Sequence, residues 1–382
     1  MSSDVKRNIL LTPGPATTTD SVKRSQVVPD ICPREAEFGA VMEHISTELA
    51  RLVADPDHYR AVLFGGSGTA AVESMICSVP GSDAMVIVNN GAYGRRMCEI
   101  AAVYGIDFLE FRSPFDEAID LDELERYIRS SGRKISHLAV VHHETTTGLL
   151  NRVKEIGELC RRYHIDMLVD AMSSFAAVPL DMKEMNISFL ASSSNKNLQG
   201  MPGVSFVIAE KSKLENLKDR KPRSYYLNLY AQYRYFAEHA QMRFTPPVQT
   251  LYALKQAIRE LKQEGIAKRY ARYTASWKTL ISGLNRLGLT YIVPEAHHAK
   301  LITAIHEPDA DFDFPSVHDF LYSKGIMIYP GKLEGLKTFR VANIGDITAK
   351  DIEVFLEWLE AYLDGVRANR RKVESRGNRS EE

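Results

Sequence analysis

Short apolar runs alternate with amphipathic segments through about the first half of the chain. Most of these runs are rich in Val, Ile, Leu or Phe without strict apolar–polar alternation, and they occupy residues 61–64, 84–88, 108–111, 137–141, 167–170, 189–192 and 204–209. Such runs are typical of strands buried on both faces of a sheet. Between them, segments such as 41–53 and 121–128 keep their apolar residues on one helical face. The pattern predicts an α/β fold with a mostly parallel central sheet flanked by helices.

The pattern changes after about residue 245. Residues 250–264 and 267–287 predict two long helices, the first of which connects two domains. Shorter segments follow, with strands expected at 291–293, 301–305, 326–329 and 338–341 and helices near 316–324 and at 349–363. These elements predict a smaller C-terminal α+β domain.

The last segment of the chain is charged and nearly free of apolar residues, which is typical of a solvated tail. We therefore expect an N-terminal arm at 1–20, a large domain at 21–265, a small C-terminal domain at 266–366 and a charged tail at 367–382. A length of 382 residues suits about two domains.

Composition excludes several classes of protein. The 48 Lys and Arg residues nearly balance the 49 Asp and Glu residues, so a broad basic face for nucleic acid or a polybasic membrane patch is not expected. No apolar run approaches the ~18 residues of a membrane span. The four cysteines lack metal-ligand spacing and form no C-x-x-C pair, which argues against a zinc site or a disulfide scaffold. We expect a cytoplasmic protein of enzyme size, without a metal.

A glycine-rich segment, 65–72 (GGSGTAAV), follows a predicted strand and opens a predicted helix. Glycines allow close approach of an anion, and Ser67, Thr69 and the free N–H groups of a helix start are suited to hold a phosphate. The segment is not a Walker sequence, and it departs from the dinucleotide-binding fingerprint. An ordinary glycine-rich turn is the alternative interpretation.

Two further residues point to the same edge of the sheet. Asp170 ends a predicted strand, where a carboxylate could hold the protonated ring nitrogen of a cofactor or could simply cap the next helix. Lys196 lies in a Ser- and Gly-rich turn, 192–203 (SSSNKNLQGMPG), after another buried strand. A lysine forms Schiff bases once its pKa is lowered, although a solvated loop lysine is the commoner case. The glycine-rich segment 65–72, Asp170 at a strand end and Lys196 in a turn follow one another in this order along the chain. Together they predict a pyridoxal 5'-phosphate site.

These segments also carry a resemblance. Segments 12–15 (TPGP), 65–69 (GGSGT), 90–94 (NGAYG), 143–148 (HETTTG), 169–170 (VD), 194–196 (SNK) and 339–345 (FRVANIG) resemble those of the class V aminotransferases, which have the pyridoxal-phosphate transferase fold type I. Within that class, segments 28–38 (VPDICPREAEF) and 143–151 (HETTTGLLN) are most similar to the 2-aminoethylphosphonate:pyruvate transaminase branch. The resemblance extends from about residue 10 to residue 363.

The resemblance implies a role for each matching residue. Lys196 would form the internal aldimine and then act as general base and acid, and Asp170 would pair with the pyridinium nitrogen. Arg340 would bind the substrate anion. The cofactor-binding residues implied are Ser67, Gly68, Thr69, Tyr93, Thr145, Asp170, Asn195, Lys196 and Thr245. Of these, Tyr93 would stack on the ring, Thr145 would lie near its phenolic oxygen, and Thr245 would reach the phosphate of the neighbouring subunit in a homodimer with shared active sites.

The implied reaction is ping-pong transamination of 2-aminoethylphosphonate with pyruvate, giving phosphonoacetaldehyde and L-alanine. Other donors stay open, namely a hydroxylated aminoethylphosphonate, or alanine or serine with glyoxylate. A lyase such as a cysteine desulfurase needs a thiolate on a mobile loop late in the chain, and no cysteine follows Cys160. A nucleotide-binding module with a degenerate site is a further alternative, but Lys196, Asp170 and Arg340 are all present.

Overall fold

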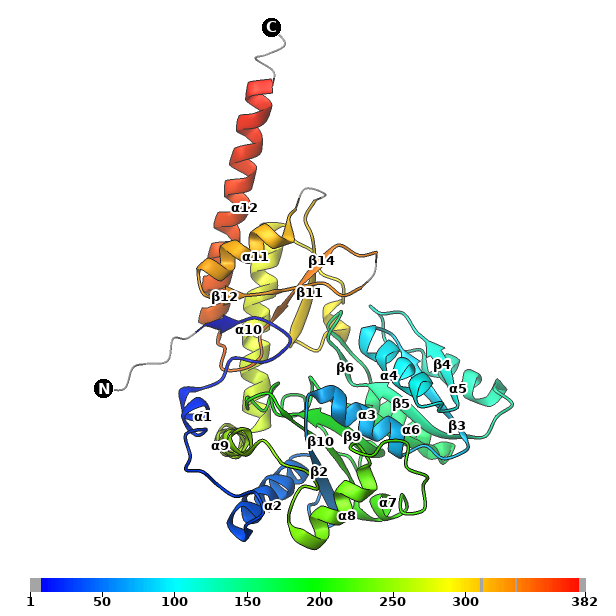
Figure 1. Ribbon diagram of the computed structural model, residues 1–382. Coiled ribbons are helices and arrows are strands. Elements are labelled where there is room, and N and C mark those ends of the chain that lie inside the picture. Colours follow the sequence, from blue (N-terminus) through cyan, green and yellow to red (C-terminus); the bar gives the residue numbers. More distant parts are fainter. Residues whose placement is uncertain (1–7, 310–311, 334, 378–382) are drawn as a thin grey trace.

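A seven-stranded sheet forms the centre of the computed structural model, which describes residues 8–309, 312–333 and 335–377 (Figure 1). In spatial order its strands are β2 (Tyr59–Gly65), β10 (Val204–Glu210), β9 (Ile187–Ser193), β8 (Asp166–Asp170), β5 (Ile135–Val141), β3 (Ala84–Asn89) and β4 (Phe108–Arg112). All the pairs are parallel except those that β10 forms with β2 and β9. Each strand contains one of the seven predicted runs, so the mostly parallel sheet is confirmed.

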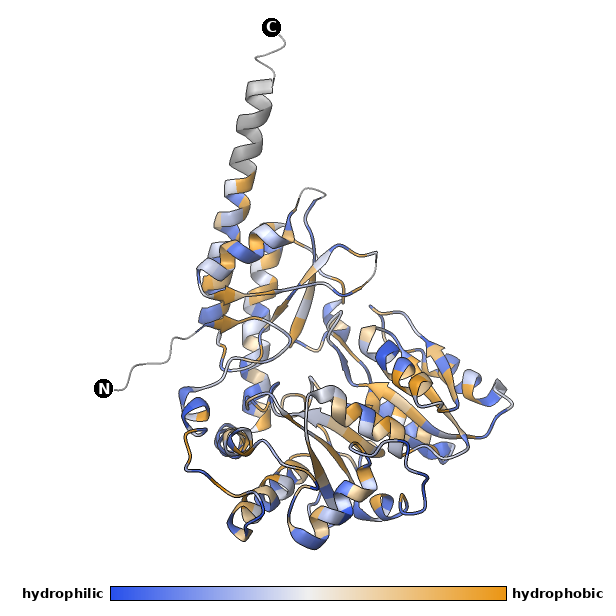
Figure 2. Cartoon of the chain, viewed as in Figure 1, coloured by the Kyte–Doolittle hydropathy of each residue, from blue (hydrophilic) through white to orange (hydrophobic). Residues whose placement is uncertain are grey.

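Helices cover both faces of this sheet. We call the sheet and these helices the large unit. One face packs against α2 (Ala36–Arg51), α5 (Leu121–Ser130), α6 (Val153–Arg162) and α9 (Val248–Glu264), and the other against α3 (Gly68–Ser78), α4 (Ala92–Val103) and α8 (Leu229–His239). Burial on both sides explains why the strands lack alternating polar positions. Figure 2 shows the consequence, with apolar residues gathered in the sheet and polar residues on the outer faces of the helices.

A smaller unit contains the antiparallel sheet β11 (Ile302–His306), β14 (Thr338–Ala342) and β13 (Tyr329–Pro330) with helices α10 (Ile266–Leu287), α11 (Phe314–Ser323) and α12 (Ala349–Gly377). The strand expected at 291–293 is wrong. Only Tyr291 pairs there, in a bridge to Ile305, because the chain turns at Pro294 into the short helix η1 (Glu295–His297).

The N-terminal arm belongs structurally with this small unit. Strand β1 (Ile9–Leu10) pairs in parallel with β12 (Ile326–Met327), and Leu11 lies in the apolar core of the small unit. The arm then crosses to the large unit. The remaining short elements are α1 (Asp20–Arg24), α7 (Lys211–Glu215) and the hairpin of β6 (His143–Glu144) and β7 (Leu149–Leu150).

The C-terminal segment differs from the prediction of a tail. Helix α12 continues from Ala349 to Gly377, well beyond the expected end at residue 363 (Figure 1). Segment 364–376 contains no proline and one glycine, and its four Arg residues together with Ala368, Lys372 and Glu374 favour a helix even without an apolar face. Within the described part of the chain, no helix has the length and apolarity needed to cross a bilayer.

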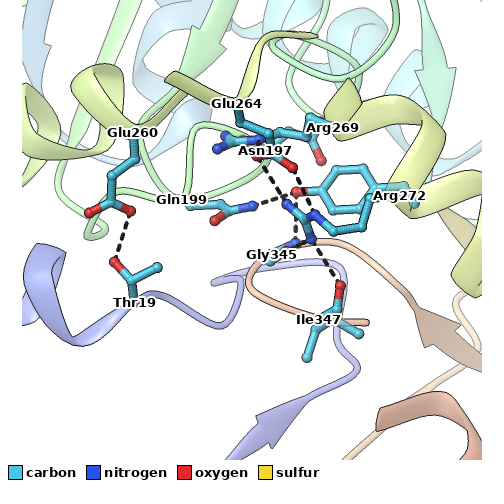
Figure 3. Close-up of polar contacts among 10 residues, drawn as sticks. Thr19, Asn197, Gln199, Glu260, Glu264, Arg269, Arg272, Gly345 and Ile347 are labelled. Carbon is cyan, nitrogen blue, oxygen red and sulfur yellow. Dashed lines mark hydrogen bonds and ion pairs between the residues drawn. The ribbon is translucent and has the colours of Figure 1, made fainter. Parts of the chain in front are cut away.

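A buried polar network joins the two units at the break between α9 and α10. Gly265, with φ of +83°, separates the two helices. Glu264 accepts hydrogen bonds from Nε of Arg269 at 2.7 Å and from Nε of Arg272 at 2.8 Å (Figure 3). Arg269 is only 2% exposed, so its charge is neutralised inside the protein by this carboxylate.

The same network reaches the turn that follows β9. Arg269 donates from Nη1 to the carbonyl oxygen of Asn197 at 2.6 Å, and Gln199 donates to the hydroxyl of Tyr273 at 2.8 Å. That hydroxyl also accepts from the backbone N–H of Gly345 at 3.0 Å (Figure 3). The turn carrying Lys196 is therefore anchored to the first helix of the small unit.

Candidate active site

A cavity of about 510 Å³ opens at the carboxyl ends of β8 and β9, beside the first residues of α3 and α4. Its lining combines the glycine-rich turn, the end of β8 and the turn after β9, and comprises Gly66, Ser67, Gly68, Thr69, Val72, Tyr93, Arg96, Asp170, Met172, Ser193, Asn195, Lys196, Pro202 and Gly203. Ligands of open α/β sheets bind at this edge. The structure thus brings together seven of the predicted site residues, which lie in four separate parts of the sequence.

Lys196 projects from the turn between β9 and β10, and its amine is partly buried. Its Nζ donates a hydrogen bond to the carbonyl oxygen of Pro13 at 2.5 Å. Burial lowers the pKa of Lys196 to about 8, and the nearby charges of Arg340, Lys332 and Arg96 act in the same direction, whereas Asp170 opposes them. An amine with this pKa is partly neutral near physiological pH and can act as a nucleophile or base.

The N-terminal arm contacts Lys196 directly. Gly14 has φ of +140°, and a Cβ atom at this position would lie 2.2 Å from Nζ of Lys196. Only glycine combines this backbone conformation with the space that the amine occupies. This explains the TPGP segment, whose contact with the lysine no local pattern revealed.

Asp170 is the last residue of β8 and is 4% exposed. Its carboxylate accepts a hydrogen bond from the backbone N–H of Met172 at 2.8 Å. Burial raises the pKa of Asp170 to about 6, and the nearby Glu144 raises it further, although Lys196 and Arg96 oppose this shift. The helix cap named as the alternative is wrong, because turns and no helix follow β8. The carboxylate holds the start of this turn, and it also lines the cavity, where it can bind a cationic group.

The glycine-rich turn leads into α3 as predicted. Ser67 is the N-cap residue, and its hydroxyl makes no capping hydrogen bond to the helix. Gly66 has φ of +156° and donates its backbone N–H to the carbonyl oxygen of Gly203 at 2.9 Å. The hydroxyls of Ser67 and Thr69 and the first N–H groups of the helix remain available to an anion.

Tyr93 also lines the cavity, and a buried glutamate holds the helix turn that carries it. The Glu144 carboxylate is fully buried and accepts hydrogen bonds from the backbone N–H groups of Tyr93 at 3.1 Å and Gly94 at 3.4 Å. It also accepts from the hydroxyl of Thr146 at 2.5 Å. Burial raises the pKa of Glu144, against the effect of these hydrogen bonds. Sequence reasoning missed this role, although Glu144 lies in the HETTTG segment.

Arg340 lies on β14 of the small unit and is 2% exposed. It donates from Nη1 to the carbonyl oxygen of Thr145 at 3.3 Å and from Nε to that of Pro330 at 3.0 Å. Burial lowers the pKa of Arg340, whereas Tyr93 raises it. Arg340 and Thr145 are therefore adjacent, next to Tyr93, although neither lines the cavity itself.

Thr245, like Arg340 and Thr145, is a predicted site residue that does not line the cavity. It is exposed, in the segment between α8 and α9, beside an aromatic cluster in which Tyr226 and Phe244 stack at 5.0 Å. Its contact with a neighbouring subunit remains a prediction.

Two adjacent histidines lie under the site. Nδ1 of His142 contacts the hydroxyl of Ser174 at 2.9 Å, and Nδ1 of His143 contacts that of Ser173 at 2.9 Å. Burial lowers the pKa of His143 to about 4, and the charge of Lys196 adds to this effect. Both rings are held neutral by their surroundings, which agrees with a structural role.

The residues fit pyridoxal phosphate by the chemistry of the groups they offer. The cofactor carries an aldehyde, a basic ring nitrogen and a phosphate. The cavity presents the amine of Lys196, the buried carboxylate of Asp170 and the open N-terminus of α3. Each reactive or charged part of the cofactor therefore has a matching group within one cavity of suitable size. Arg96, one helical turn after Tyr93, is a further lining cation that sequence reasoning did not single out.

The chain is similar to known proteins in sequence and in structure. The family model for class-V aminotransferases matches residues 22–340. The 2-aminoethylphosphonate–pyruvate transaminases of Klebsiella pneumoniae subsp. pneumoniae and Salmonella paratyphi B are 40% and 41% identical, over 353 and 358 residues, or 91% of this chain and 95% of each relative. The crystal structure of alanine–glyoxylate aminotransferase from Nostoc sp. aligns with a TM-score of 0.87 at 28% identity, over 95% of this chain and 97% of that one.

A more distant structure shares the fold. Pyridoxamine–pyruvate aminotransferase from Mesorhizobium loti aligns with a TM-score of 0.86 at 21% identity, over 96% of this chain and 94% of that chain. The expected fold type is thus found in proteins of known structure. Because the family model spans most of the residues and the relatives are 40% identical over nearly the full length, the chain belongs to the class-V aminotransferase family.

Proposed function

We propose that the protein transfers the amino group of 2-aminoethylphosphonate to pyruvate, producing phosphonoacetaldehyde and L-alanine. As a class-V aminotransferase it is a pyridoxal-phosphate-dependent transaminase. The relatives at 40–41% identity are named for this substrate pair. The observation that best supports the proposal is the cavity holding Lys196 and Asp170, with the Arg340 guanidinium close enough to depress the pKa of Lys196.

Most of the residues that would hold the cofactor come from the large unit. Bound pyridoxal phosphate supplies a carbon that accepts the amino group and a ring that withdraws electrons from the substrate. Ser67, Gly68, Thr69 and Asn195 would bind the phosphate. Asp170 would keep a proton on the ring nitrogen, because a buried carboxylate strongly favours a cationic partner. Tyr93 would cover the ring face, and Thr145 would lie near the phenolic oxygen.

Lys196 would move the proton that transamination requires. Its Nζ would take a proton from the substrate carbon that bears the nitrogen and return it to the cofactor carbon. General acid–base transfer needs a pKa near the working pH, which the lowered pKa of about 8 provides. The hydrogen bond from Nζ to Pro13 shows that the amine already has a fixed acceptor on the arm.

Arg340 would bind the anionic end of each substrate in turn. Phosphonate and carboxylate both present two or more oxygens in a plane or fork that a guanidinium can bind with paired hydrogen bonds. Its two hydrogen bonds to backbone carbonyls orient the group without neutralising its charge. One anchor can therefore serve both halves of a ping-pong reaction.

The protein would work in the cytoplasm as a homodimer with shared active sites. Thr245 is exposed in one chain, and in a dimer its hydroxyl would reach the partner's cofactor phosphate. Sedimentation of the purified holoenzyme tests the assembly. A monomer that retains full activity and cofactor at nanomolar concentration would contradict shared sites.

A donor panel tests the proposed substrate pair. The purified enzyme is mixed with 2-aminoethylphosphonate, its hydroxylated analogue, L-alanine or L-serine, and conversion of the cofactor absorbance is followed in single turnovers. We expect 2-aminoethylphosphonate to react fastest among the donors other than L-alanine, the reverse substrate, and pyruvate to restore the starting spectrum with formation of alanine. Glyoxylate is tested beside pyruvate as the acceptor, because the structural neighbour from Nostoc sp. is named for glyoxylate. Reaction with serine and glyoxylate but not with 2-aminoethylphosphonate would contradict the proposal.

A further inference from the structure

The hairpin that carries Arg340 also carries a second cation. Tyr329 and Pro330 of β13 pair with Arg340 and Phe339 of β14, and the Gly331 N–H donates to the carbonyl oxygen of Thr338 at 2.8 Å. Lys332 follows directly, where the two strands separate. Its place is therefore set by the same backbone that positions Arg340.

Lys332 extends from the hairpin toward the large unit. Its Nζ lies 5.6 Å from the centroid of the Tyr93 ring, and Tyr93 lines the cavity. The side chain is exposed, and among the described residues no acidic group forms an ion pair with it. Its positive charge also contributes to the lowered pKa of Lys196, so its field reaches the reacting amine. A cation near the cavity that has no counter-ion among the described residues is suited to an anionic ligand.

The charge of the substrate decides which ligand this arrangement favours. A carboxylate carries one negative charge, which Arg340 alone can balance. A phosphonate that has lost both protons carries two. We propose that Lys332 supplies the second positive charge for the phosphonate group and thereby favours aminoethylphosphonate over carboxylate donors. The inference rests on the proposed function, because it names the group that selects its donor.

The two substrates should respond differently to loss of this charge. Coulomb energy scales with the product of the charges, so removing Lys332 weakens the binding of a dianion about twice as much, in free energy, as that of a monoanion. In rate terms, the fold-loss for the phosphonate is about the square of the fold-loss for the carboxylate. Because Lys332 is exposed, its substitution leaves the core unchanged.

The test compares Lys332→Met with Lys332→Arg and with the control Lys337→Met, which removes another exposed lysine of the same hairpin. For each holoenzyme, kcat/KM of the half-reaction is measured with 2-aminoethylphosphonate and with L-alanine, at low and high salt. We expect Lys332→Met to lose about tenfold with the phosphonate and about threefold with alanine. Lys332→Arg should retain most of the preference, and added salt should reduce the difference between wild type and Lys332→Met.

Equal losses with both donors, or no loss with either, would overturn this inference while leaving the proposed function intact. An identical loss of preference in Lys337→Met would also overturn it, because the effect would then be that of general surface charge. A wild-type enzyme that does not react with 2-aminoethylphosphonate at all would overturn both proposals. The cofactor spectrum of each variant identifies any change in the large unit.

Discussion

The two walls of the candidate active site offer different kinds of chemical group. The large-unit wall, made by the ends of β8 and β9 and the starts of α3 and α4, offers a carboxylate, an amine and helix N–H groups. The small-unit wall, made by the hairpin of β13 and β14, offers the cations Arg340 and Lys332. The first set matches a cofactor, and the second matches an anionic substrate. Under the proposed function, the large unit would therefore supply the chemistry and the small unit would determine which substrate binds.

The walls are alike in one respect, because each buries a charge that lacks a full protein counter-ion. Asp170 is buried with its pKa raised, and Arg340 is buried with its pKa lowered. Both shifts mean that burial disfavours the charged form. Under the proposed function, a ligand of opposite charge would complete each group, a ring cation for Asp170 and a substrate anion for Arg340.

A rigid link connects the walls. Arg269 at the start of α10 donates to the carbonyl oxygen of Asn197, the residue after Lys196. A small shift of the small unit relative to the sheet would strain this buried contact. This contact thus fixes Lys196 relative to the small unit that carries Arg340, although the two residues belong to different units.

The large-unit wall is tested most severely by Lys196→Ala. We expect turnover to fall by roughly 10³-fold or more, because both the nucleophile and the proton carrier are lost, while the cofactor still binds noncovalently. Steady-state alanine formation, with the absorbance of the bound cofactor as a control, measures this. Near-normal alanine formation would remove Lys196 from the mechanism.

Asp170→Asn should have the next largest effect. The amide can hydrogen-bond to the ring nitrogen but cannot keep it protonated, so proton removal from the substrate should slow by about 10²-fold or more. The isolated half-reaction is measured by rapid mixing. A rate within about threefold of wild type would leave Asp170 only a structural role, the hydrogen bond that it accepts from Met172 in the turn after β8.

Arg340→Lys tests the small-unit wall. Lysine keeps the charge but loses the planar fork, and charge-assisted hydrogen bonds are worth about 1.5–3 kcal/mol each. We expect kcat/KM to fall by roughly tenfold to hundredfold for both substrates, with the cofactor spectrum unchanged. If the loss is confined to pyruvate, the phosphonate is held elsewhere and a single anchor is excluded.

Glu144→Gln alters the hydrogen bonds that hold the start of α4 in the large-unit wall, while the side chains that line the cavity stay unchanged. One carboxylate oxygen becomes an N–H donor, so a bond to the start of α4 or to Thr146 is lost at about 1 kcal/mol. We expect kcat/KM to fall by roughly three- to tenfold for both donors. A loss as large as that of Asp170→Asn would mean that Glu144 acts on the reaction itself.

The smallest effect concerns stability and pH. Because the pKa of Asp170 rises from 3.8 to about 6 on folding, its charge destabilises the cofactor-free protein. This penalty is absent below pH 3.8, grows up to about pH 6 and stays constant above it. Cofactor-free Asp170→Asn should therefore be more stable than wild type by about 1–3 kcal/mol at pH 7. Urea unfolding at pH 5 and pH 7 measures the difference, and an equal gain at both pH values would contradict this account.

The sequence determined the architecture of the large unit and the order in which its candidate site residues follow one another along the chain. Apolar runs without alternation identified each strand of the central sheet, because burial on both faces leaves this signature in short segments. Asp170, Lys196 and the turn around Ser67 were recognisable because a strand end or a glycine-rich turn is also a local feature. The extension of α12 to Gly377 was missed, since a charged helix has no apolar stripe to reveal it.

Only the tertiary structure decided which distant residues complete the site. Pro13 meets Lys196 across 183 positions, and Arg340 meets Thr145 across 195. The capping of α4 by Glu144 and the approach of Lys332 to Tyr93 are likewise contacts between separate elements. The periodicity of a segment records which of its faces is buried, but not what it is buried against. The partners were therefore set by the packing of the two units.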